Sequence, residues 1–63
     1  MRRGSLWTRE GIKALRLRLG LTQRELARVV CCSFATVNRW ENGHALPLPL
    51  MERRLLELAK ARD

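Results

Sequence analysis

The fold of this 63-residue chain is decided by residues 19–43, which read LGLTQRELARVVCCSFATVNRWENG. Thr22 and Glu25 are spaced as in a capping box, in which the Thr hydroxyl accepts from the Glu amide and the Glu side chain reaches back. This pattern predicts a helix that begins at Gln23 and runs to about Val30. Such a short helix is not stable alone in water, so it must pack on its neighbours.

A second short helix is predicted at 34–41. Ser33 is its N-cap, and Asn42-Gly43 is a stop signal because both residues tolerate positive φ. The residues between the two helices, Cys31 to Ser33, form a short turn. Two short helices separated by a turn of this size have the dimensions of a helix-turn-helix.

Two further helices are predicted on either side of this pair, at 8–19 and 49–61. Thr8 can cap the first of them, and Pro49 suits the first turn of the last because its missing N–H costs nothing there. Apolar residues recur at helical spacing in both helices, namely Ile12, Leu15, Leu19, Met51, Leu55 and Leu58. The predicted fold class is therefore all-α, a compact domain of four helices.

The charge balance favours an anionic partner. Thirteen Lys and Arg, eleven of them Arg, stand against six Asp and Glu, for a net charge of +7. Arg suits phosphate because its planar fork donates two parallel hydrogen bonds. No apolar run approaches the ~20 residues that span a bilayer, so we expect no membrane partner and a cytoplasmic, nucleoid-associated location. We expect residues 1–7 to be a flexible basic lead-in and residues 8–63 to form the domain.

Residues 19–27, with Ser33, Val37 and residues 40–43, closely resemble the phage-repressor and Cro-like (XRE-type) helix-turn-helix family. The resemblance covers roughly residues 8–58. It implies a lambda-repressor-like fold in which the second and third helices form the helix-turn-helix, and it implies binding to double-stranded DNA.

The resemblance also implies roles for individual residues. Gln23 is expected to contact a DNA phosphate at the start of the second helix, and Asn42 to hold another phosphate. Residues 34–41 are expected to be the recognition helix in the major groove. Arg16 and Glu41 occupy positions that often form a buried ion pair in this family.

The chain departs from the family pattern at two positions. Cys31 stands where the family usually has Gly, although a non-Gly residue disfavours positive φ. Phe34 stands where the family often has a polar or basic residue. The adjacent Cys31 and Cys32 have poor geometry for a disulfide, and with His44 they supply too few ligands for a metal. We expect both to be small, partly buried apolar residues.

A helical wheel of residues 34–41 separates a buried face from an outward face. Val37 and Trp40 mark the core direction. The base-reading candidates are Phe34, Ala35, Asn38 and Arg39. Arg39 can bind guanine through two hydrogen bonds, and Asn38 can read adenine. For Phe34 two environments remain open, a thymine methyl group or the protein core.

The candidates for phosphate contact are Thr22, Gln23, Arg24, Ser33, Thr36, Asn42 and His44. Ser33 is expected to act first as a helix cap. Thr36 is open between a structural hydrogen bond and a DNA contact, and His44 between a solvated loop position and a phosphate contact.

Two function classes follow. The first is sequence-specific binding of double-stranded DNA by a repressor-like transcriptional regulator, acting as a homodimer if its site is palindromic. The second is an antitoxin or accessory module that binds a partner protein, such as a toxin, and its own operator. One His, two Cys and no clustered carboxylates leave no nucleophile–base pair, so we expect no catalytic residue, cofactor or metal.

Overall fold

The computed structural model describes residues 7–61, which contain four helices and no strand. The helices are α1 (Arg9–Arg18), α2 (Gln23–Val30), α3 (Phe34–Glu41) and α4 (Pro49–Ala61). This arrangement confirms the predicted all-α, four-helix fold class. Only α1 is shorter than predicted, because Thr8 and Leu19 are its caps rather than its helical residues. The lead-in expected before Trp7 lies outside the described residues.

Each of the first three helices begins at a side-chain cap. Thr8 and Ser33 accept hydrogen bonds from the backbone N–H three residues ahead, at 3.1 Å in both cases. The capping box before α2 is complete: Glu25 N–H donates to Thr22 Oγ1 over 3.0 Å, and Thr22 N–H donates to Glu25 Oε1 over 2.8 Å. These bonds satisfy backbone donors that a helix start otherwise leaves without partners.

A single apolar core joins the four helices. Its fully buried members are Ile12, Leu15, Leu26, Ala27, Val30, Val37, Trp40 and Leu55, each at most 5% exposed. Burying one large aliphatic side chain stabilises a fold by about 1.5–3 kcal/mol, so this cluster supplies much of the stability of a small domain. Trp7 packs against the same cluster from the chain before α1.

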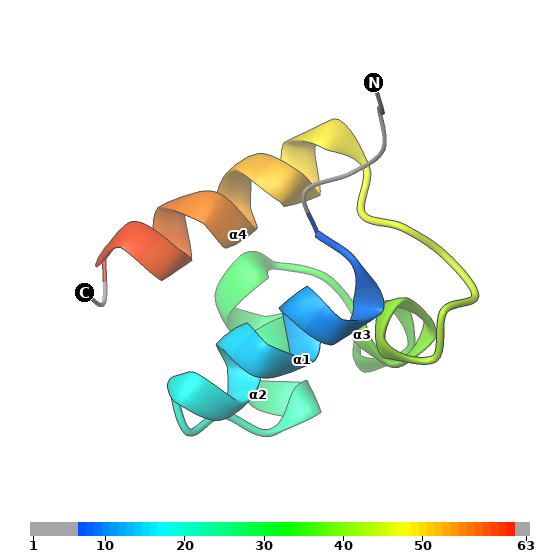
Figure 1. Ribbon diagram of the computed structural model, residues 1–63, viewed down its shortest axis with the longest axis horizontal. Helices are drawn as coiled ribbons and strands as arrows, with labels where there is room; N and C mark the ends of the chain where they lie inside the picture. The colour runs from blue at the N-terminus through cyan, green and yellow to red at the C-terminus, as the bar shows by residue number, and fades with distance from the viewer. Residues whose placement is uncertain (1–6, 62–63) are drawn as a thin grey trace.

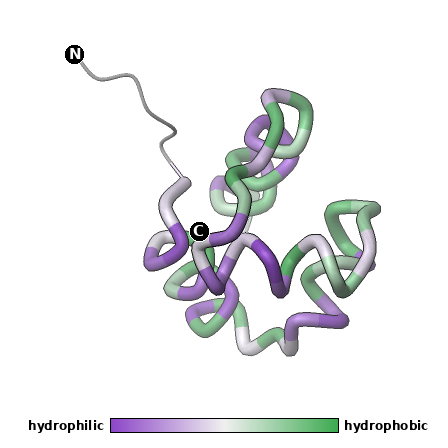
Figure 2. Tube along the Cα trace, turned by 90° about the vertical axis from the view of Figure 1, so that its right-hand side faces the viewer, coloured by the Kyte–Doolittle hydropathy of each residue, from purple (hydrophilic) through white to green (hydrophobic). Residues whose placement is uncertain are grey.

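The helices are arranged so that α3 keeps one face uncovered. In Figure 1, α4 lies across one side of the other three helices, and a long connection leads to it from the end of α3. Hydrophobic and hydrophilic segments alternate along the helices in Figure 2, as expected where each helix buries only one stripe. α2 packs against both α3 and α4, and α1 packs against α3.

The turn between α2 and α3 adopts the left-handed conformation. Cys31 has φ 65° and ψ 47°, the region that a helix end commonly assigns to Gly. Cys31 is exposed, contrary to the expected partial burial, because this backbone conformation directs its side chain away from the core, whereas Cys32 is half-buried. Arg54 of α4 donates to the Val30 carbonyl at 3.1 Å and so ties α4 to the last residue of α2.

Candidate nucleic-acid interface

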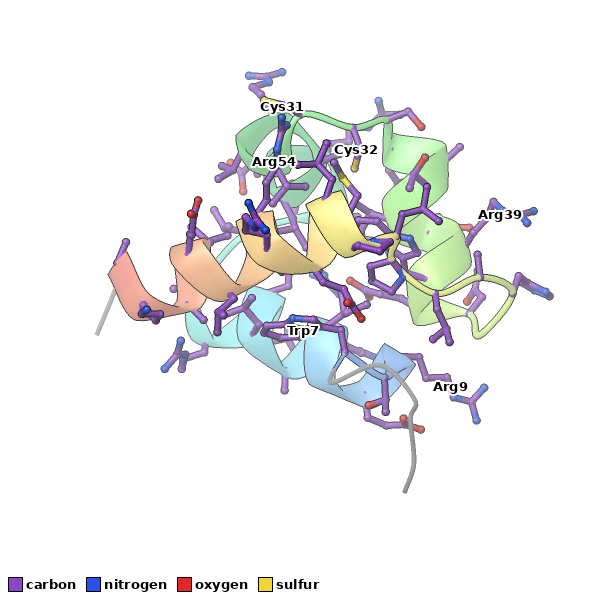
Figure 3. All side chains as sticks on the ribbon, turned by 90° about the horizontal axis from the view of Figure 1, so that it is seen from above. Trp7, Arg9, Cys31, Cys32, Arg39 and Arg54 are labelled. Carbon is purple, nitrogen blue, oxygen red and sulfur yellow. The ribbon has the colours of Figure 1, made fainter. Side chains whose placement is uncertain are left out.

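The outward face of α3 presents Ala35 and Arg39 to solvent. The opposite face is anchored in the core by Val37 and Trp40, which are 0% and 2% exposed. In Figure 3 the Arg39 side chain extends from α3 away from the rest of the molecule. The small Ala35 side chain allows the helix to approach the floor of a DNA groove closely. The extended Arg39 guanidinium can then reach the edges of the bases.

Asn38 occupies a different environment from its neighbours on α3. It is half-buried, and its side-chain amide donates to Gln23 Oε1 at 3.2 Å. Its carbonyl oxygen accepts from Asn42 Nδ2 at 3.0 Å. Asn38 therefore joins the expected phosphate-contacting residues Gln23 and Asn42 to each other, a connection that the helical wheel did not reveal.

A partly buried ion pair lies at the other end of this connection. Arg16 Nε is 2.7 Å from Glu41 Oε2, and Arg16 Nη2 donates to Glu41 Oε1 at 3.0 Å. The two side chains are only 13% and 4% exposed. Arg16 also donates to the Leu21 carbonyl at 3.1 Å, so its guanidinium holds the chain between α1 and α2 as well.

The environment of Glu41 keeps its carboxylate ionised. Burial raises the pKa of this carboxyl, but hydrogen bonds from Arg16 and Gln23 outweigh that effect, and its pKa lies below the ordinary value. The Gln23 bond is 3.1 Å long. Conversely, the hydrogen bond to Glu41 raises the pKa of Arg16.

These contacts form one polar network of five side chains: Arg16, Glu41, Gln23, Asn38 and Asn42. It connects α1, α2 and α3 and extends to the residue that follows α3. The network fixes the start of α2 relative to α3. A rigid ligand that contacts both the start of α2 and the outward face of α3 requires these two surfaces to keep a constant relative position, and the network provides it.

The start of α2 carries backbone donors suited to an anion. The capping box uses the amides of Thr22 and Glu25. The first-turn amides of Gln23 and Arg24 have no acceptor within the helix, because the first turn of any helix lacks one. Such amides, at the positive end of the helix dipole, favour a phosphate oxygen.

The hydroxyl groups before α3 are used within the protein. Ser33 Oγ accepts from the Thr36 amide at 3.1 Å, and it lies 2.9 Å from Thr36 Oγ1, an interaction in which either hydroxyl can donate. Ser33 thus caps α3, and Thr36 is half-buried. A DNA contact by either residue would have to share its hydroxyl with this local bond.

Phe34 does not pack into the protein core, so of the two environments left open by the sequence the contact with a thymine methyl group stays a prediction. It is 40% exposed and lies outside the core cluster. The guanidinium of Arg24, from the first turn of α2, lies over its ring, with Cζ 4.8 Å from the ring centroid. Sequence reasoning missed this contact because it joins two helices whose relative position the spacing does not specify.

Arg9 is a basic residue that sequence reasoning did not single out. A Cβ built on Gly43, which has φ +79°, would lie 3.0 Å from Arg9 Nη1, so Arg9 crosses directly over the turn after α3. His44, also in this turn, is exposed, and its N–H donates to the Arg39 carbonyl at 2.9 Å. Arg9 therefore places a positive charge beside the turn that follows α3.

Comparison with known proteins identifies the family. Residues 12–61 match the helix-turn-helix family. This chain belongs to it. Its α2, turn and α3 are the helix-turn-helix of a DNA-binding domain of the phage-repressor and Cro-like type, which confirms the resemblance seen in the sequence.

Curated relatives of this helix-turn-helix chain carry the name mycobacterial cidal antitoxin MbcA. Those of Mycobacterium bovis and of Mycobacterium tuberculosis are each 44% identical to it over 46 residues, which is 73% of this chain and 41% of the relative. The chain thus spans about two fifths of the length of the curated relatives that it matches. No solved structure matches the chain.

The described part of the helix-turn-helix domain shows no group of three or more His, Cys, Asp or Glu that could hold a metal ion. Cys31 and Cys32 are free thiols. Burial, with the neighbouring Cys31 as a smaller cause, raises the pKa of Cys32. Among residues 7–61, no helix has the length and apolar character needed to cross a membrane.

Proposed function

We propose that this chain binds double-stranded DNA in a sequence-specific manner, with α3 in the major groove, as a repressor-like transcriptional regulator. The observation that carries the proposal is the outward face of α3, where Arg39 is exposed while Val37 and Trp40 fix the helix from behind. An α-helix fits the major groove, and Arg bound to guanine is its commonest specific contact.

Phosphate contacts position the domain on the duplex. Gln23 and the first-turn amides of α2 grip one backbone phosphate, and Asn42 grips another beyond the end of α3. The polar network supports this assignment because it holds Gln23, Asn38 and Asn42 in one hydrogen-bonded series. Phosphate contacts set register and orientation, and base contacts supply the sequence preference.

The test is a selection of binding sites from random duplex DNA, followed by titration of the enriched site at two salt concentrations. We expect one enriched motif and an affinity that falls steeply with salt, because Lys and Arg contacts release counterions. A palindromic motif would indicate a homodimer, since two-fold protein symmetry is mirrored in the site. Binding with no enriched motif would contradict sequence-specific recognition.

A second candidate function is that of an antitoxin module which binds a toxin protein and its own operator. The similarity to relatives named mycobacterial cidal antitoxin favours it. The test is co-expression of this chain with the protein encoded beside its gene. Rescue of growth together with a stable complex of the two chains would support the antitoxin role. A neighbouring protein that is harmless alone and does not co-purify would contradict it.

A further inference from the structure

The contact between Arg24 and Phe34 joins the starts of the two helices of the helix-turn-helix. Arg24 lies in the first turn of α2, and Phe34 is the first residue of α3. The guanidinium carbon lies 4.8 Å from the ring centroid, within the range of a cation–π contact. Neither residue belongs to the core, and both are exposed.

The cation–π contact holds the guanidinium over the ring by its charge rather than by a hydrogen bond to an acceptor. The N–H donors of Arg24 that point away from the ring are therefore available for a ligand. The ring also limits the orientations open to this long side chain. A preorganised Arg loses less conformational freedom when it binds a fixed pair of acceptors.

We propose that Arg24 and Phe34 form a single reading unit for a thymine and a guanine in adjacent base pairs. This inference rests on the proposed function, in which the start of α3 enters the major groove. Guanine presents two acceptors there, O6 and N7, and thymine presents its C5 methyl group. Arg24 donates to the guanine acceptors, and the Phe34 ring packs against the thymine methyl.

The geometry favours this pairing over a phosphate contact by Arg24. Successive nucleotides of a strand are about 3.4 Å apart along the axis, so two groups 4.8 Å apart can contact adjacent base pairs. A phosphate contact by Arg24 needs no aromatic neighbour. An exposed Phe at the first position of a recognition helix gains from an apolar partner, and the thymine methyl is the apolar group of the major groove.

The test uses the selected site and two modified copies of it. In one copy uracil replaces the thymine, which removes the methyl group. In the other, 7-deazaguanine replaces the guanine, which removes the N7 acceptor. The proteins are the parent, Arg24→Lys, which keeps the charge but not the fork, and Phe34→Leu, which keeps apolar bulk but not the ring. Arg28→Ala, at an exposed Arg of the same helix, is the matched control.

The parent should lose roughly 5- to 150-fold in affinity on a mismatch at the guanine, the range of a bidentate base contact, and should lose affinity on both modified copies. Arg24→Lys should be less sensitive to 7-deazaguanine than the parent, because Lys lacks the planar fork that binds both guanine acceptors. Phe34→Leu should keep part of the sensitivity to uracil, because Leu is still apolar, but should weaken discrimination at the guanine, because the cation–π contact with Arg24 is gone. Arg28→Ala should keep the preferences of the parent.

An equal loss of affinity for every sequence in Arg24→Lys would show a phosphate contact and overturn the inference. A selected site without an adjacent thymine and guanine would overturn it as well, while leaving sequence-specific binding intact. A parent protein without any enriched site would instead remove the proposed function, and this inference with it. The three results are distinguishable in the same titrations.

Discussion

Gln23 Nε2 donates a 3.1 Å hydrogen bond to Glu41 Oε1, so the first residue of α2 is joined to the last residue of α3. The same carboxylate accepts from Arg16 of α1. Three helices therefore share one nearly buried acceptor. The stability of the domain and the register of its proposed DNA contacts both depend on this carboxylate.

Removing the Glu41 carboxylate should strongly destabilise the fold. Glu41→Ala leaves the Arg16 guanidinium, 13% exposed, without its counter-ion. Breaking a buried ion pair in this way costs about 3–5 kcal/mol. At the usual stability per residue, a chain of this size has only about 3–9 kcal/mol in total. Urea unfolding followed by circular dichroism should show a large loss of stability or an unfolded protein.

The matched control is Glu57→Ala, which removes an exposed carboxylate from α4. It should change the free energy of unfolding by less than about 0.5 kcal/mol. If the two variants unfolded at the same urea concentration as the parent, the Glu41 network would not contribute to stability as described.

Acidification should destabilise the domain partly through Glu41. Its folded-state pKa lies below the ordinary value of 4.5, so the unfolded chain takes up this proton first. The contribution of Glu41 is therefore complete above that ordinary value and is lost as pH falls through the lowered folded pKa. The free energy of unfolding, measured down the acid range, should fall less steeply in Glu41→Gln. An identical slope in both proteins would contradict the lowered pKa.

The sequence predicted the helices well because their caps are local. Thr22 and Ser33 each lie beside the backbone groups that they satisfy, so their spacing alone marks where α2 and α3 begin. The contacts between helices are different. The contacts of Asn38 with Gln23 and of Arg24 with Phe34 depend on the angle at which α2 and α3 cross. The spacing of residues within one helix does not predict that angle.

The Arg16–Glu41 pair was anticipated only through the family resemblance, since nothing in the spacing of two residues 25 positions apart predicts their contact. Cys31 is an intermediate case. The sequence predicted that α2 ends near Val30. The residue that follows has a positive φ, which Gly adopts without strain, but this chain has Cys31 there.

Cys31→Gly should stabilise the domain. A non-Gly residue in the left-handed region costs about 1–2 kcal/mol, which the substitution removes. The greater freedom of Gly in the unfolded chain opposes this stabilisation by about 0.5–1 kcal/mol. The melting temperature in a reducing buffer should rise by a few degrees. The control is Arg28→Gly, three residues earlier within α2, which should lower it because Gly disfavours a helix. A fall in both variants would contradict the strain assigned to Cys31.

Gln23→Ala should weaken DNA binding without changing its sequence preference. Gln23 is proposed to hold a phosphate, and loss of a phosphate contact affects all sequences about equally. The variant also loses the bond to Glu41, so its stability should fall modestly. Titration against the selected site and its single-base variants, below the melting temperature, separates the two effects. A changed preference at one base pair would show that Gln23 reads a base.

The proposal that α3 reads base sequence is tested most directly by titrating Arg39→Ala against the selected site and every single-base variant of it. Arg53→Ala, at an exposed Arg of α4, is the control for lost charge. We predict that Arg39→Ala loses about 1–3 kcal/mol on the selected site and no longer distinguishes the base pairs at one position. Arg53→Ala should keep every preference. An Arg39→Ala protein with the full preference of the parent at all positions would contradict the assignment of α3 as the reading helix.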